Sequence, residues 1–218
     1  MCGRFAFYSP IEATAALFGA SGSVPIEARY NIAPTQYVAA IRNAEDSTRE
    51  LTLLRWGLVP FWAKDPSIGN RMINARAETV AEKPAFRAAY RHRRCIVLAD
   101  GFYEWHREGS GKTPYYISTA DAQPFAFAAL WENWTSKETG ESIQSTTLLT
   151  TGADEFMTAL HHRMPVVLNP DSATVWLAGG NDALDYALSH NPELRAWPVD
   201  RRVNNARNEG EDLIQAVS

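Results

Sequence analysis

The sequence is poor in cysteine: its 218 residues contain only Cys2 and Cys95. So few cysteines exclude a disulfide framework, and Cys95, inside the apolar run 94–98, is predicted to be a small buried side chain. No stretch approaches the roughly 20 apolar residues of a membrane span, and the beginning of the chain lacks the pattern of a secretory signal. We therefore expect a cytoplasmic protein with no membrane partner.

The sequence also lacks an excess of positive charge, because its formal net charge is -4 and its isoelectric point is about 5.8. This composition argues against a protein that coats nucleic acid, although a local basic groove could still bind phosphates. His161 and His162 are adjacent, and the chain has no paired Cys-x-x-Cys or His-x-x-x-His spacing. The sequence therefore predicts neither a metal site nor a cofactor.

The chain contains many short strand-like segments and few helical ones. Strands are predicted near 36–42, 51–56, 94–98, 102–106, 115–119, 125–131, 145–150, 197 and 213, and helices near 10–18, 84–90, 153–160, 169–179 and 182–189. Ser9 and Glu12 are predicted to form a capping box at the first helix. There is no repeat and no evident linker, so we expect a single α+β domain over 1–218, with a largely antiparallel, barrel-like sheet flanked by short helices.

Cys2 is the first candidate for chemistry, because removal of Met1 would leave it with a free α-amine and a thiol. An N-terminal amine, with a pKa of about 7.7–8.0, is partly neutral at pH 7 and attacks aldehydes to give a Schiff base. The thiol can then add to the same carbon and close a five-membered thiazolidine ring, which an internal cysteine cannot form. An abasic site in DNA supplies such an aldehyde when its sugar opens. The alternative is that Cys2 is an incidental residue at a frayed end.

Asn74, Glu104 and His161 form a second set of candidates. Glu104 is the only acidic residue among aromatic side chains on a predicted strand, and a carboxylate in an apolar setting can shuttle protons. His161 follows a predicted helix, and histidine suits acid catalysis near neutral pH. A capping asparagine, a surface glutamate and a loop histidine are the structural alternatives.

Nucleic-acid contacts are suggested by arginines next to these candidates, namely Arg4, Arg76 and Arg163. The loop after position 56 contains Phe61 and Trp62, whose rings could stack on bases. Composition does not separate this interpretation from a core aromatic cluster with solvated arginines. The basic run 91–94 is interpreted as a solvated helix end.

Taken in order, the motifs of the chain resemble those of the SRAP family, named for SOS-response-associated peptidases. The matching segments are MCGRF (1–5), RYNIAPT (29–35), RWGLVP (55–60), INARAET (73–79), ADGFYEW (99–105) and HHRMP (161–165), with VNN (203–205) near the end. Together they span essentially the whole chain. His162 departs from the family pattern, in which an acidic residue often precedes Arg-Met-Pro.

The resemblance implies a single domain on a distorted β-barrel, with a mature chain that starts at Cys2. It implies a monomer that captures abasic sites in single-stranded DNA covalently, including sites at single-strand/double-strand junctions, and that lies near the nucleoid in a bacterium. The implied catalytic residues are Cys2 as nucleophile, Asn74 holding the terminal residue and the sugar, Glu104 for proton transfers and His161 as the acid. The implied DNA-binding residues are Arg4, Asn31, Arg76, Thr150 and Arg163, with Trp62 and Pro34 supporting neighbouring bases.

The sequence is also compatible with two other functions. In a cysteine peptidase or N-terminal-nucleophile hydrolase, including an autopeptidase that removes Met1, the thiolate of Cys2 would attack an amide. A non-covalent single-strand-binding module would bind DNA in a salt-sensitive way, regardless of the abasic site.

Overall fold

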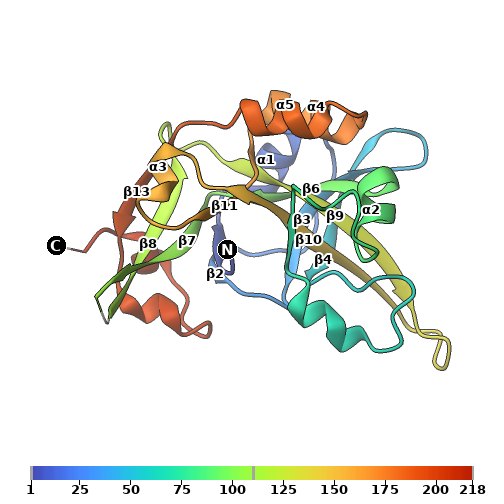
Figure 1. Cartoon of the computed structure of the whole chain (residues 1–218), viewed down its shortest axis with the longest axis horizontal. Helices are drawn as coiled ribbons and strands as arrows, with labels where there is room; N and C mark the ends of the chain where they lie inside the picture. The colour runs from blue at the N-terminus through green and yellow to red at the C-terminus, as the bar shows by residue number, and fades with distance from the viewer. Residues whose placement is uncertain (1, 110, 218) are drawn as a thin grey trace.

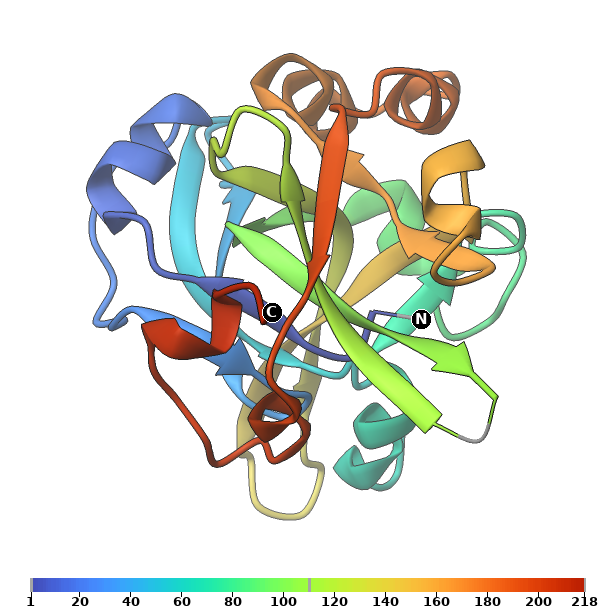
Figure 2. The ribbon, with the colours of Figure 1, turned by 90° about the vertical axis from the view of Figure 1, so that its left-hand side faces the viewer.

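The structure is a computed structural model that describes residues 2–109 and 111–217. Its strands form two sheets, of which the first lies on the left in Figure 1 and faces the viewer in Figure 2. This first sheet is antiparallel in the order β13-β8-β7-β1-β2. Its strands are β1 (Phe5–Phe7), β2 (Arg29–Ile32), β7 (Gly101–Glu108), β8 (Gly111–Thr119) and β13 (Leu194–Pro198).

The second sheet closes into a barrel. Its ring runs β10-β4-β3-β6-β9 and returns to β10, because β9 pairs with β6 through its first half and with β10 through its second. The ring is antiparallel except between β10 and β4. The strands of this sheet are β3 (Tyr37–Asn43), β4 (Arg49–Trp56), β5 (Asn74–Arg76), β6 (Arg94–Ala99), β9 (Phe125–Thr135), β10 (Ser142–Gly152), β11 (Arg163–Pro165) and β12 (Val167–Leu168). The expected α+β class with a largely antiparallel, barrel-like sheet is therefore confirmed.

The barrel strands are buried on both faces, which explains their continuous apolar sequences. Residues 95–99 of β6 are all fully buried, since one face points into the barrel and helices cover the other. The predicted burial of Cys95 is confirmed, and its carbonyl accepts a hydrogen bond from Trp176 Nε1 at 2.9 Å. This bond attaches the covering helix to the barrel wall.

An aromatic cluster joins the two sheets. Phe5 of β1 meets Trp56 and Phe127 edge to face, with ring centroids 5.2 and 5.5 Å apart. Phe102 of β7 lies against Phe127 at 6.0 Å. Because edge-to-face pairs add about 0.5–1.5 kcal/mol each to area burial, this cluster holds the first strand firmly against the barrel.

The helices are short and lie outside the sheets, with α4 and α5 above the barrel in Figure 1. The α-helices are α1 (Ile11–Leu17), α2 (Arg87–His92), α3 (Glu155–Thr158), α4 (Pro170–Ala178) and α5 (Ala183–Ser189), and the 3-10 helices are η1 (Pro66–Arg71), η2 (Arg201–Asn204) and η3 (Glu211–Ile214). Within the described part of the chain, none of the helices combines the length and apolar character needed to span a bilayer.

Three local predictions were wrong. Ser9 does not cap α1: its hydroxyl donates to Asp100 across the sheet, and Glu12 accepts from Ser23. The helix predicted from position 84 begins at Arg87, after a turn. The strand predicted near Leu213 is the 3-10 helix η3, because only an isolated bridge between positions 199 and 216 forms there.

Candidate functional site

Cys2 lies inside the protein, just before β1. Its side chain is fully buried, and its carbonyl accepts a hydrogen bond from Asn74 Nδ2 at 2.8 Å. Asn74 begins β5, which runs parallel to β10 in register with Leu148. Asn74 Oδ1 is also buried and accepts no hydrogen bond within the described residues. The structure thus brings together two of the predicted catalytic residues.

Glu104 lies beside the segment that carries Cys2. The backbone N–H of Tyr103 donates to Arg4 O at 3.0 Å, which aligns β7 with residues 2–4. The Glu104 side chain is only 3% exposed. Burial first, and the Glu104 carboxylate second, raise the pKa of the Cys2 thiol well above its usual value. At neutral pH the thiol therefore keeps its proton, and a carboxylate lies close enough to influence it.

His161 lies between α3 and β11, at the other side of β10. Its Nδ1 lies 3.0 Å from both the backbone nitrogen and the carbonyl oxygen of Arg163, so the backbone of Arg163 fixes the position of the ring. The ring stacks on His162, with centroids 4.3 Å apart. β10 pairs with β5, which begins at Asn74, and with β11, which begins two residues after His161.

Arg4 and Asn31, both predicted to contact phosphates, are bound to each other. Arg4 Nη1 donates to Asn31 Oδ1 at 2.7 Å and to Val203 O at 2.8 Å, while burial lowers the pKa of the guanidinium. Asn31 is fully buried, and its Nδ2 donates to the carbonyls of Val203, Asn205 and Asn208. In this arrangement Asn31 orients Arg4 and anchors the C-terminal segment, and it presents no surface to a ligand.

Thr150 and Arg163 form a second such pair. Thr150 is 1% exposed, and its carbonyl and hydroxyl accept from Arg163 Nη2 at 2.7 and 3.2 Å. Arg163 also makes a two-point ion pair with Glu78, and this hydrogen bonding lowers the pKa of the Glu78 carboxyl. Arg76, which pairs with Thr150 across β5 and β10, is exposed. Among the five polar residues predicted to bind DNA, Arg76 is exposed, whereas the other four are buried or half-buried.

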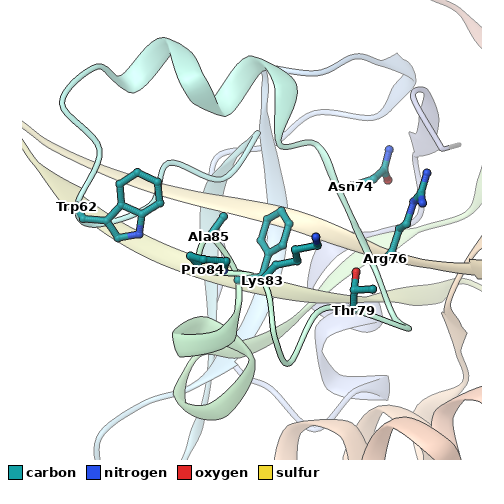
Figure 3. A pocket seen from close by; sticks show the side chains of 8 residues that line it. Trp62, Asn74, Arg76, Thr79, Lys83, Pro84 and Ala85 are labelled. Carbon is teal, nitrogen blue, oxygen red and sulfur yellow. The ribbon is translucent and has the colours of Figure 1, made fainter.

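An open cavity of about 540 Å³ extends from Asn74 to Trp62, and we call it the Trp62 cavity. Trp62 lies at one end and Asn74 and Arg76 at the other, with residues 83–85 between them (Figure 3). Trp62 is 49% exposed and also borders a second cavity of about 410 Å³ on η1. The lining residues of the Trp62 cavity are Trp62, Asn74, Arg76, Thr79, Lys83, Pro84, Ala85 and Phe86.

Three residues of this region were not recognised from the sequence. Glu78 was not recognised as the partner of Arg163, and Lys83 and Phe86 were not assigned to the cavity. Glu78 lies within the family-like segment 73–79 and the other two lie shortly after it, so their position in the sequence could have pointed to this region. Pro34 is half-buried on the loop after β2 and does not line the Trp62 cavity.

Metal ligands are not grouped in this region or elsewhere in residues 2–109 and 111–217. No three His, Cys, Asp or Glu side chains in these residues lie together in a way that could hold a metal ion. The predicted catalytic residues offer a thiol, a carboxylate, an imidazole and an amide.

Comparison with known proteins gives a consistent result. The model of the family described as SOS response associated peptidase (SRAP) matches residues 1–206. The chain is 41% identical to abasic site processing protein YoaM of Bacillus subtilis, over 99% of this chain and 98% of that protein. It is 35% identical to abasic site processing protein YedK of Escherichia coli, over the full length of both.

A solved structure agrees with these sequence matches. A crystal structure of a protein from Bacteroides thetaiotaomicron superposes with a TM-score of 0.87, at 26% identity and with complete coverage of both chains. Sequence and fold are thus similar over essentially the entire length of the chain. The chain therefore belongs to the SRAP family of SOS response associated peptidases.

Proposed function

We propose that this protein processes abasic sites by capturing them covalently in single-stranded DNA, through a thiazolidine between Cys2 and the opened sugar. The observation that carries the proposal is the position of Cys2, which is buried, held by Asn74 and influenced by Glu104. The relatives named above, which are called abasic site processing proteins, support the same substrate class. Met1, whose removal the proposal requires, lies outside the described residues.

The reaction needs only groups that this chain and the DNA supply. The α-amine of the mature Cys2 attacks the sugar aldehyde, and the resulting carbinolamine loses water, with a proton supplied by His161, to give an iminium ion. The Cys2 sulfur then bonds to the same carbon, the carbon–nitrogen π electrons return to nitrogen, and the thiol proton passes to Glu104. One molecule of water is released in total, and no oxidant or reductant is required.

Ring closure would protect the DNA strand. An open iminium acidifies the neighbouring C–H bond and promotes β-elimination, which cuts the strand. The thiazolidine removes this electron sink. In this scheme the thiol converts the intermediate of a lyase into a durable cross-link.

The raised pKa of the Cys2 thiol favours this function over that of a cysteine peptidase. A peptidase needs a thiolate, whereas burial raises the pKa of the Cys2 thiol. In the proposed reaction the amine attacks first, so the thiol adds to an already activated carbon. The thiol proton is then lost after the electrophile has formed, to a carboxylate that lies nearby.

The DNA strand would lie along the Trp62 cavity. Arg76 is exposed beside Asn74 and would bind a phosphate next to the lesion, and Trp62 would support a neighbouring base. Asn31 and Thr150 would act indirectly, by orienting Arg4 and Arg163. We propose that the same monomeric chain also accepts single-strand/double-strand junctions.

Intact mass spectrometry of the protein with an abasic oligonucleotide tests the proposal. We expect a species heavier than the Met1-free protein by one oligonucleotide minus one water, stable on a denaturing gel. Cys2→Ala should retain a transient Schiff base but lose the heat-stable adduct by at least about a hundredfold, because intramolecular ring closure supplies a large effective molarity.

Cys2→Ser is the matched variant, since an oxazolidine is less stable than a thiazolidine. An undamaged oligonucleotide of the same sequence controls for non-covalent binding. A heat-stable adduct equal to the wild type in either variant, or in protein that retains Met1, would disprove the thiazolidine mechanism. Rapid cleavage of unrelated peptides would instead support a peptidase.

A further inference from the structure

A further cavity lies at the opposite end of α2 from the Trp62 cavity. Its volume is about 140 Å³, and we call it the Arg91 cavity. Its wall is formed by the end of α2, the start of β6, the end of β3 and the C-terminal end of α4. The lining residues are Asn43, Arg91, His92, Arg94, Trp131, Leu177, Ala178 and Gly179.

The charge around this cavity is unusual for an acidic protein. Between Glu82 and Asp100 the sequence contains five lysines and arginines, one histidine and no acidic residue. Arg91 and His92 are exposed, and Arg91 has no ion pair among the described residues. Arg93 is paired with Glu132 at 2.8 Å, so the cations that stay without a carboxylate partner at this cavity, among the described residues, are Arg91 and Arg94.

Arg94 is held in place without a carboxylate partner among the described residues. Its guanidinium lies over the rings of Tyr90 and Trp176, at 4.7 and 4.6 Å from their centroids. Nε donates to Tyr90 O and Nη2 to Gly180 O, whereas Nη1 is buried and makes no hydrogen bond. Arg94 therefore keeps an unpaired positive charge in the wall of the Arg91 cavity, where it attracts anions.

The two cavities are aligned along one short helix. Residues 83–86, which precede α2, line the Trp62 cavity, and Arg91 and His92, which end α2, line the Arg91 cavity. A helix of six residues is about 9 Å long, which a few nucleotides of an extended strand can span. A strand leaving the Trp62 cavity along α2 would meet the cations at its end.

We infer that the Arg91 cavity binds a backbone phosphate of the same DNA strand, beyond the nucleotides that occupy the Trp62 cavity. This inference rests on the proposed function, because it extends the path of the captured strand. It assigns Arg91 and Arg94 of the basic run to DNA, whereas the sequence alone favoured a solvated helix end.

The test compares oligonucleotides with short and long arms around a tetrahydrofuran analogue, which lacks the aldehyde and reports non-covalent binding. With arms of eight nucleotides, Arg91→Gln should raise the Kd about threefold to tenfold and reduce the slope of log K against log salt by about 0.7. With arms of two nucleotides, Arg91→Gln should bind like the wild type. Lys112→Gln, an exposed cation on the β7–β8 hairpin, is the matched control and should change neither value.

Two outcomes overturn the inference: an equal effect of Arg91→Gln on both arm lengths, or no effect on either. Thermal unfolding with inorganic phosphate separates a free anion from the DNA backbone. If phosphate stabilises the wild type more than Arg91→Gln but arm length has no effect, the cavity binds free phosphate and the DNA path is wrong. Wild-type cross-linking of an aldehyde-bearing oligonucleotide is measured in parallel, so failure of the proposed function is seen separately.

Discussion

The segment around Cys2 and the loop that carries Trp62 differ in burial and in hydrogen bonding. Cys2 is fully buried, its carbonyl is held by Asn74, and Glu104 beside it is 3% exposed. Phe61 and Trp62 are 56% and 49% exposed. The two regions would therefore have separate roles: protons are transferred at a buried position that is held by hydrogen bonds, and the DNA strand stacks a base on the exposed ring of Trp62.

The largest effect expected from this separation of roles is at Glu104. Glu104→Gln keeps the shape of the side chain but cannot accept the thiol proton, so we expect adduct formation to slow by about a hundredfold or more. The Kd for a tetrahydrofuran oligonucleotide should stay within about twofold, because Glu104 is placed to move protons and its side chain faces no phosphate in this proposal. Single-turnover gel kinetics and fluorescence anisotropy measure the two quantities.

Glu138→Gln, on the exposed turn between β9 and β10, serves as the control for loss of one acidic charge. If Glu104→Gln weakened binding as much as it slowed the chemistry, the separation of the two regions would be incorrect.

A smaller effect of the opposite kind is expected at Trp62. Trp62→Ala should raise the Kd for single-stranded DNA about fivefold to a hundredfold, since stacking one base contributes about 1–3 kcal/mol. The rate of adduct formation at saturating DNA should stay close to that of the wild type. Phe61→Ala is the matched variant, because Phe61 is equally exposed but lines neither cavity at Trp62. Equal losses in the two variants would point to the loop as a whole rather than to the Trp62 ring.

The smallest effect concerns the ion pair that supports Arg163. Because the pKa of Glu78 is lowered in the folded protein, the pair stabilises the fold above the ordinary carboxyl pKa of about 4.3 and loses this contribution as the pH falls through the lower folded value. Glu78→Gln should therefore cost about 0.2–1 kcal/mol at pH 7, because the Glu78 side chain is 49% exposed and screened.

Urea unfolding at pH 7 and pH 3 measures this difference between wild type and Glu78→Gln. The difference should shrink toward zero at the lower pH. A difference that persisted at pH 3 would show that the carboxylate charge is not the cause.

Much of the fold could be predicted from local patterns, but the smallest strands could not. The strands near 36–42, 51–56 and 94–98 and the helix at 169–179 were predicted because each has a clear apolar run or a capping signal. β1, β5 and β11 each have three residues, which is too short to show an alternating pattern. These strands nevertheless carry or adjoin Cys2, Asn74 and His161, so the site is built on the elements that sequence patterns detect least well.

Some features of the candidate site could be predicted from the sequence and others could not. Cys2 and Glu104 could be selected by chemistry, since one offers an amine and a thiol and the other is an isolated acid. The ring-like closure of β9 onto both β6 and β10 could not be predicted, and neither could the role of Asn31. Asn31 was expected to touch phosphate, but its burial is decided by carbonyls of residues 203–208, which lie far along the chain.

By itself, the sequence determined which reactive side chains the protein contains and which segments favour a strand or a helix. Both properties depend on a residue and its neighbours in the sequence. The tertiary structure decided which groups meet: β10 brings β5 and β11 to its two edges, and β7 brings Glu104 to Cys2. It also decided the protonation of Cys2, since the pKa of a thiol depends on how much water and charge surround it in space.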